Sequence, residues 1–313
     1  MGMPIAPSTI IVFFLVTASA YSDKPSVLLR EVVLNASSAS EESAYNQIRK
    51  IFGDGSVESP DLFKGDHSEA ERIRVRDDPE VGPCFDFYLH RDEDGDRDVI
   101  WPKGQRRQRN EIKGYKGSDT GLKATRGQVV RYHWLFRING EMSVTKQFCH
   151  FFQLKAVGGD NTESPIFTIS GSIVDRRSQL ELRTRSAQDG PRDEKRIFDW
   201  DSSRNKWIEC VCVACFDEEG YFRISLRSLD GTLSFGHEVS KMNTWRKGSK
   251  FVRPKWGIYR SLEDKERIVN KEDTVSFARF RIQEWSDLGM PTVLESDDTD
   301  QSASAVDQQV EDN

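Results

Sequence analysis

The stretch Phe251 to Ser261, "FVRPKWGIYRS", is rich in strand-forming residues and carries a lysine and a tyrosine four positions apart. Successive side chains of a strand point to opposite faces, so Lys255, Gly257 and Tyr259 share one face. The apolar residues between them take the other face. The stretch therefore predicts a strand with an apolar core face and a polar face that presents an ammonium and a phenol together.

Similar short β-rich runs continue from about residue 58 to residue 286, separated by Gly, Asp and Asn turns; examples are "CFDFYLH", "QVVRYHWLFRI", "PIFTISGSIV", "WIECVCVACF" and "VSFARFRIQEW". The segment "FDEEGYF" (216–222) predicts a tight hairpin between two of them. Many short strands without intervening helices favour an all-β domain, either a two-sheet sandwich or a jelly roll.

The segments outside 58–286 differ in composition. Residues 21–57 contain Tyr45, Ile48, Ile51 and Phe52 at helical spacing, which predicts one amphipathic helix in an accessory N-terminal segment. Residues 287–313 hold eight acids and no Lys or Arg, so we expect a disordered acidic tail. Without that tail, 45 basic residues face 43 acidic ones, so any basic patch must be local and nucleic-acid binding is not expected.

The N-terminus has the pattern of an exported protein. The apolar run "IIVFFLV" (10–16) is too short to span a bilayer but suits a signal peptide over 1–20, with Ala18-Ser19-Ala20 as the cleavage site. A buried N-terminal strand is the alternative. Asn35-Ala36-Ser37 is a glycosylation sequon. We therefore expect a secreted glycoprotein that has no membrane span and acts as a monomer.

The five cysteines allow no complete disulfide framework, since an odd number leaves at least one thiol free or paired with another chain. Cys210 and Cys212 lie two apart on a predicted strand and would point the same way, which makes them poor partners for each other. The run "CVCVAC" has no second Cys/His cluster to complete a zinc site. We expect core cysteines and no metal site there.

Two further segments add polar faces to the one on 251–261. In "RQRNEIKGY" (107–115), Arg109, Glu111 and Lys113 share a face. In "FCHFFQLKA" (148–156), strand alternation places Gln153 and Lys155 on one face with Cys149 and Phe151, and sends His150 to the opposite face unless a bulge intervenes. A curved sheet that joins these polar faces would form a cationic groove containing a phenol.

The order of these motifs resembles that of the jelly-roll polysaccharide lyases, which include alginate, glucuronan and heparin lyases. The resemblance covers about residues 80 to 285 and rests on three segments: Lys255 to Arg260, "RNEIK" and the glutamine segment at Gln153. It implies a concanavalin A-like β-jelly roll that cleaves a uronic-acid-containing polysaccharide by β-elimination on the concave face of one sheet.

The resemblance also implies roles for individual residues. Gln153 and Arg109 would neutralise the uronate carboxylate beside the acidic C5 proton. Tyr259 would donate a proton to the departing O4, and neighbouring cations should favour its phenolate form, which would let it act as base too. Glu111 would orient Arg109 or Lys113. The substrate-binding set is Glu111, Lys113, His150, Lys255 and Arg260.

The chain departs from the family pattern at one position, because Lys155 stands where the family has histidine. The base is therefore left open between Tyr259, Lys155 and His150. Loss of that histidine also leaves a non-catalytic carbohydrate-binding protein as an alternative. A glycoside hydrolase ranks third, because no strand carries the paired carboxylates that such an enzyme needs.

No cofactor is required by this chemistry. The segment "DEDGDRD" (Asp92 to Asp98) imitates a calcium loop but lacks glycine at the sixth position and glutamate at the twelfth. We expect a solvated turn there, with calcium as the minor alternative because some relatives bind it. The expected partner is an acidic polysaccharide.

Overall fold

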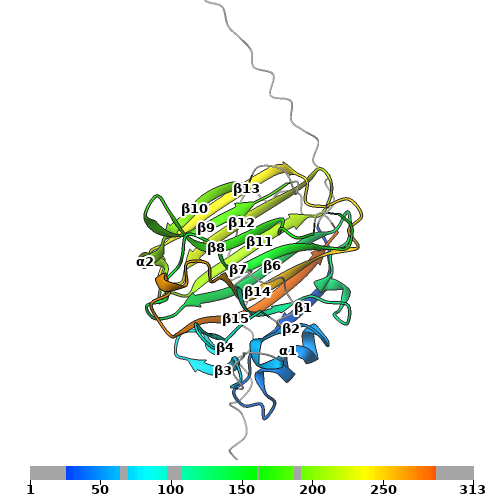
Figure 1. Cartoon of the computed structure of the whole chain (residues 1–313). Coiled ribbons are helices and arrows are strands. Elements are labelled where there is room, and N and C mark those ends of the chain that lie inside the picture. Colours follow the sequence, from blue (N-terminus) through cyan, green and yellow to red (C-terminus); the bar gives the residue numbers. More distant parts are fainter. Residues whose placement is uncertain (1–25, 64–69, 97–106, 161, 187–191, 287–313) are drawn as a thin grey trace, which may run out of the picture.

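The computed structural model describes residues 26–63, 70–96, 107–160, 162–186 and 192–286. Its strands form two antiparallel sheets packed face to face, and Figure 1 shows the two layers. The predicted signal peptide and acidic tail lie outside the described residues. None of the described helices is both long enough and apolar enough to cross a membrane.

One sheet has eight strands in the order β13-β12-β11-β6-β15-β4-β3, with β1 also paired to β15. Its strands are β1 (Leu28–Leu34), β3 (Ile73–Asp78), β4 (Gly82–His90), β6 (Val129–Ile138), β11 (Ile208–Cys215), β12 (Gly220–Ser228), β13 (Ser234–Met242) and β15 (Glu272–Trp285). The predicted hairpin is confirmed, since Cys215 pairs with Tyr221 across the turn between β11 and β12.

The second sheet has seven strands in the order β10-β9-β8-β7-β14-β5-β2. Its strands are β2 (Val57–Glu58), β5 (Arg107–Lys113), β7 (Cys149–Val157), β8 (Phe167–Val174), β9 (Arg177–Thr184), β10 (Asp193–Asp199) and β14 (Phe251–Ser261). Strand β14 lies between β5 and β7, so the three segments with predicted polar faces are direct neighbours.

Aromatic side chains fill the space between the two sheets. Trp256 of β14 lies 6.0 Å from Trp134 of β6 and 5.4 Å from Phe152 of β7, measured between ring centroids. All three are fully buried. Burial of large rings is the main source of stability in such a core, and it fixes which face of β14 points outward.

The predicted N-terminal helix is α1 (Ala44–Phe52), which begins at Ser43, whose side chain accepts a hydrogen bond from the Asn46 N–H. Tyr45, Ile48 and Phe52 are buried as predicted, whereas Ile51 is exposed. The segment before residue 58 also contains strands that the sequence analysis did not predict, since β1 pairs with β15 and β2 pairs with β5. Figure 1 places α1 beside both.

The remaining helices are short: α2 (Trp200–Ser203) and the 3-10 turns η1 (Pro60–Leu62), η2 (Thr120–Leu122) and η3 (Lys265–Arg267). None of the five cysteines forms a disulfide. Cys210 and Cys212 are fully buried on β11, as predicted for core cysteines.

Candidate active site

Strands β5 and β14 bring their polar faces into register. Tyr259 pairs with Arg109 and Lys255 pairs with Lys113, while Gly257 pairs with Glu111 between them. Strand alternation therefore holds along both strands, and the polar side chains share the outer face of the seven-stranded sheet. On the other flank of β14, Lys255 pairs with Gln153 of β7.

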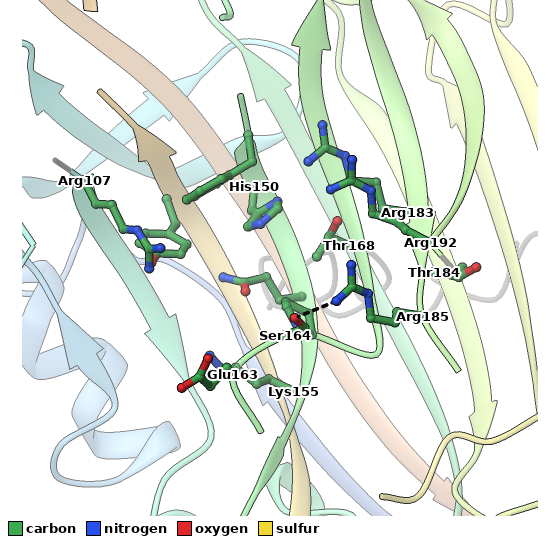
Figure 2. Close-up of a pocket in the computed structure, with 14 residues that line it drawn as sticks. Arg107, His150, Lys155, Glu163, Ser164, Thr168, Arg183, Thr184, Arg185 and Arg192 are labelled. Carbon is green, nitrogen blue, oxygen red and sulfur yellow. Dashed lines mark hydrogen bonds between the residues drawn. The ribbon is translucent and has the colours of Figure 1, made fainter. Parts of the chain in front are cut away.

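A cavity of about 220 Å³ opens on this face (Figure 2). Tyr259, Gln153, Lys155 and His150 line it, together with Arg107, Phe148, Glu163, Ser164, Pro165, Thr168, Arg183, Thr184, Arg185 and Arg192. The lining contains one carboxylate and five Lys or Arg side chains. A cavity with this excess of positive charge favours an anionic ligand.

Strand β7 departs from regular alternation at Phe151. His150 pairs with Ser170 of β8, and Phe152 pairs with the next residue, Ile169, so β7 holds one extra residue there. Phe151 and Phe152 consequently both face the core, which corrects the prediction that Phe151 shares a face with Gln153. The same bulge turns His150 into the cavity beside Gln153.

Arg109 lies beneath Tyr259 and does not line the cavity. Its guanidinium carbon is 3.8 Å from the centroid of the Tyr259 ring. Its nitrogens donate to Glu58 (3.2 Å), Glu111 (2.9 Å) and Asp96 (2.8 Å). Burial lowers the pKa of Arg109, but these carboxylates outweigh it and hold the pKa well above its ordinary value. The guanidinium is thus paired with protein carboxylates, contrary to its predicted contact with substrate.

Lys113 and Lys255 belong to the same buried network. Lys255 contacts Glu111 and lies 2.9 Å from Glu58, and Lys113 lies 2.5 Å from Glu58. Glu111 also accepts a hydrogen bond from the Gln153 amide. The network therefore ties β2, β5, β7 and β14 together and fixes Gln153 from below, rather than presenting Lys113, Lys255 and Glu111 to a ligand.

Tyr259 faces the cavity with its hydroxyl, which accepts a hydrogen bond of 2.8 Å from Arg107. Burial raises the pKa of Tyr259, and the lowering effect of Arg109 and Arg107 does not outweigh it. This corrects the expectation that neighbouring cations favour the phenolate. At neutral pH Tyr259 is a phenol that can donate a proton.

Lys155 and His150, the other two candidates for the base, both line the cavity. Burial, with the neighbouring charges of Lys255 and Arg109, lowers the pKa of Lys155 to about 7. Among the described residues, no hydrogen bond or ion pair reaches the Lys155 side chain. Burial also holds the pKa of His150 well below its ordinary value, and its Nδ1 lies 2.7 Å from the Ser170 hydroxyl. Both groups are available as neutral bases near pH 7.

A comparison with protein-family models matches residues 41–275 to the model described as "Polysaccharide lyase". The chain belongs to the polysaccharide lyase family. The match spans more than half of the sequence and includes every predicted site residue. A comparison with curated protein sequences gives no significant match.

A comparison with solved structures finds similarity to other polysaccharide lyases. A marine PL-14 alginate lyase from Aplysia kurodai matches with a TM-score of 0.51 and 8% identity, over 82% of this chain and 98% of that one. An endo-β-1,4-glucuronan lyase from the fungus Trichoderma reesei matches with a TM-score of 0.47 and 16% identity, over 73% and 94%. An alginate lyase from Klebsiella pneumoniae has a TM-score of 0.47 and 9% identity, over 80% and 94%. The first confirms the predicted jelly-roll fold class.

Arg260 does not line the cavity, although it was predicted to bind substrate. It follows Tyr259 on a regular strand, so it points to the opposite face. There it is buried, pairs with Asp273 and donates a hydrogen bond of 2.9 Å to Gln108. The prediction rested on the motif from Lys255 to Arg260 and on the position of Arg260 next to Tyr259, and neither specifies the face to which Arg260 points.

The cavity arginines were missed by the sequence analysis. Arg107 continues the polar face of β5 two residues before Arg109, and Arg183 lies on β9 opposite Thr168. The alternation in "LELRTRS" (180–186) carries this signal, because Leu180 and Leu182 are buried in the core while Arg183 and Arg185, which follow them, line the cavity. Without the sheet order, nothing in the sequence places β9 beside β7 and β8.

The structure describes the acidic segment Asp92 to Asp98 as far as Asp96. The described part binds arginines, one of which lies beneath Tyr259. Asp94 lies 3.1 Å from Arg72, and Asp96 binds Arg109. Gln108 donates to three backbone carbonyls of the same turn. The described residues contain no cluster of three His, Cys, Asp or Glu arranged for a metal ion.

Proposed function

We propose that this lyase cleaves a uronic-acid-containing polysaccharide by β-elimination in the cavity on the seven-stranded sheet. One observation carries the proposal: Tyr259, a protonated phenol, and Lys155, an amine with a pKa near 7, face the same cation-rich cavity. β-Elimination from a uronate needs a base for the C5 proton, an acid for the departing O4 and positive charge near the carboxylate.

The acid in this reaction is Tyr259. Its hydroxyl accepts from Arg107, so its own hydrogen is not used in that contact. Among the described residues no acceptor for that hydrogen is present. The phenol can therefore give its proton to O4 as the C4–O4 bond breaks.

The base is Lys155. Of the three candidates, Tyr259 is protonated and must act as acid, and the low pKa of His150 makes its imidazole a weaker base than the Lys155 amine. The free amine removes the proton from C5, and the electron pair of that C–H bond forms the C4=C5 double bond. No water is consumed, and the products are one shortened chain and one chain with an unsaturated end.

The carboxylate of the reacting sugar is neutralised by Gln153 and by the positive field of the cavity. The Gln153 amide donates one hydrogen bond to Glu111, which fixes its orientation and leaves its second N–H for the ligand. Fixed donors and charges of this kind stabilise the negative charge that develops on the carboxylate as the C5 proton leaves.

We also propose that the lyase is secreted and glycosylated, and that it meets its polymer outside the cell as a monomer. The apolar N-terminal run and the exposed side chain of Asn35 in its sequon support this proposal. Sequencing the N-terminus of exported protein should find the mature chain beginning at Tyr21. A mature chain that retains residues 1–20 would contradict it.

The function is tested by incubating the purified lyase with glucuronan, alginate and heparin and analysing the products by mass spectrometry. Elimination gives fragments that are lighter by one water than those from hydrolysis and that absorb ultraviolet light. We expect such fragments from at least one of the polymers. Hydrolytic fragments, or binding without cleavage of any uronate polymer, would contradict the proposal.

A further inference from the structure

Arg107 differs from Arg109, Arg183 and Arg192 in its partners. Arg109 binds three carboxylates, Arg183 contacts Glu181 and Arg192 contacts Glu194. Within the described part of the chain, Arg107 has no carboxylate partner. Its guanidinium makes one hydrogen bond, the 2.8 Å contact from Nη1 to the Tyr259 hydroxyl. Among the described residues, the Tyr259 hydroxyl is therefore the one hydrogen-bonding partner of the Arg107 guanidinium.

Aromatic rings hold the Arg107 guanidinium in this place. Its central carbon lies 5.6 Å from the Phe148 ring centroid and 5.9 Å from the Tyr259 centroid. Phe148 is itself stacked on His150 with centroids 4.6 Å apart. A guanidinium against ring faces keeps its charge while its direction is restricted, and Figure 2 shows Arg107 reaching the cavity from the β5 side.

The direction of the Arg107–Tyr259 hydrogen bond has a chemical consequence. A guanidinium can only donate, so the Tyr259 oxygen must accept. The phenol hydrogen is then left to point elsewhere. If the phenol loses that hydrogen, the same contact becomes a charge-assisted bond to a phenolate, which is about twice as strong as a neutral one.

We propose that Arg107 is a positioning residue for Tyr259, which directs the phenol hydrogen toward the ligand and stabilises the phenolate formed when the proton passes to O4. This inference rests on the proposed β-elimination. The sequence analysis expected the neighbouring cations as a group to stabilise the Tyr259 phenolate. The inference assigns this effect to Arg107, which contacts the Tyr259 hydroxyl directly. Arg109, by contrast, packs against the ring from below.

The test compares Arg107→Gln with Arg107→Lys and with Arg192→Gln, a matched variant that removes a cavity guanidinium without a Tyr259 contact. We expect Arg107→Gln to lower kcat by about 10- to 100-fold, the value of one hydrogen bond to a charged group. The alkaline limb of its kcat/KM profile should move to higher pH, because a cation lowers the pKa of a phenol. Arg107→Lys should recover part of kcat, and Arg192→Gln should raise KM without moving the alkaline limb.

A second readout does not depend on turnover. The absorbance of tyrosine phenolates is titrated against pH in proteins with and without the Tyr259→Phe substitution, and the difference between the two curves gives the titration of Tyr259. The pair of titrations is recorded once in the wild-type background and once in the Arg107→Gln background. We expect the Tyr259 transition at higher pH without Arg107. An unchanged transition, or a kinetic effect equal to that of Arg192→Gln, would overturn the inference. Failure of the wild-type protein to eliminate any polymer would instead contradict the proposed function, and the titration would still decide the role of Arg107.

Discussion

At the scale of single residues, burial prepares the acid and the base by the same physical effect. Removal from water disfavours the charged form of any side chain. Burial therefore keeps Tyr259 as a phenol and raises its pKa, and it keeps part of Lys155 as a free amine and lowers its pKa to about 7. The two side chains could be predicted from the motif order, but their protonation could not, because it depends on depth beneath the surface.

Lys155 should set the acidic limb of the pH profile. Since only the free amine can act as base, kcat/KM should rise as the pH increases through about 7. Lys155→Gln should lower kcat by about 10²–10⁴-fold and abolish that limb. The measurement is the initial rate at which unsaturated ends form between about pH 5 and pH 9, a range that includes the expected rise of kcat/KM near pH 7.

Lys155→Arg provides the control for this prediction. An arginine keeps the positive charge for carboxylate binding but cannot lose its proton. If Lys155 is the base, Lys155→Arg should be as inactive as Lys155→Gln. Near wild-type turnover in Lys155→Arg would show that the side chain only binds substrate.

At the scale of elements, regular strands were predictable and irregular ones were not. The register of β14 on β5 follows strict alternation, so the sequence placed Tyr259, Lys255 and Glu111 on one face correctly. The bulge at Phe151 on β7 reversed the expected directions of His150 and Phe151. A bulge depends on pairing with neighbouring strands, and a single strand sequence contains no record of its partners.

Gly257 should be essential to the approach of β14 and β5. Its φ is +140°, and an added Cβ would lie 2.1 Å from the Asn110 carbonyl oxygen. Gly257→Ala should destabilise the protein by about 1–3 kcal/mol, because the backbone is strained and the neighbouring strand must shift. Urea unfolding measures this change.

Gly236→Ala on β13 is the matched control, since nothing lies within 4 Å of its added Cβ. It should change the free energy of unfolding by no more than about 0.5 kcal/mol. Equal effects of the two substitutions would contradict the close approach at Gly257.

Glu58 should link the stability of the β2–β5–β14 network to pH. Burial raises the pKa of Glu58, but Lys255, Arg109 and Lys113 outweigh burial and hold the pKa well below 4.5. The contribution of ionised Glu58 to the free energy of unfolding is therefore present above the unfolded-state pKa of this carboxyl. That contribution is lost as the pH falls below the unfolded-state pKa. Glu58→Gln should lower the free energy of unfolding by about 3–5 kcal/mol at pH 7, because three cations lose a buried partner.

The exposed Glu41 supplies the comparison, because Glu41→Gln should change stability by less than about 0.5 kcal/mol. The stability difference between wild-type and Glu58→Gln should narrow in acid. A difference that stays constant from neutral pH into acid would contradict the role of the ionised carboxylate.

At the scale of the whole molecule, the two-sheet architecture followed from the number and spacing of apolar strands. The edge strands escaped prediction for a physical reason. β10 and β13 have few buried side chains, and β13 alternates between exposed and half-buried residues from Ser234 to Ser240. Strands at the edge of a sheet need no apolar face, so their sequences lack the hydrophobic period by which the central strands were recognised.

The cysteines provide a test of the whole fold. Cys84, Cys149, Cys210 and Cys212 are buried, and burial raises the pKa of each thiol. A thiol reagent should therefore modify at most Cys215 in the folded protein and all five cysteines after unfolding. Reducing agents should leave Tm unchanged. Rapid modification of several thiols in the native state would contradict the packing of β4, β7 and β11.

The most direct test of elimination by Tyr259 and Lys155 is the rate of ultraviolet absorbance from unsaturated ends, compared between wild-type protein and Tyr259→Phe on the preferred polymer. The phenyl ring keeps its packing against Arg109, so Tm and polymer binding should be retained. We predict that the rate falls by about 10²–10⁴-fold, the usual contribution of a general acid. A folded Tyr259→Phe protein that forms unsaturated ends at the wild-type rate would contradict the account.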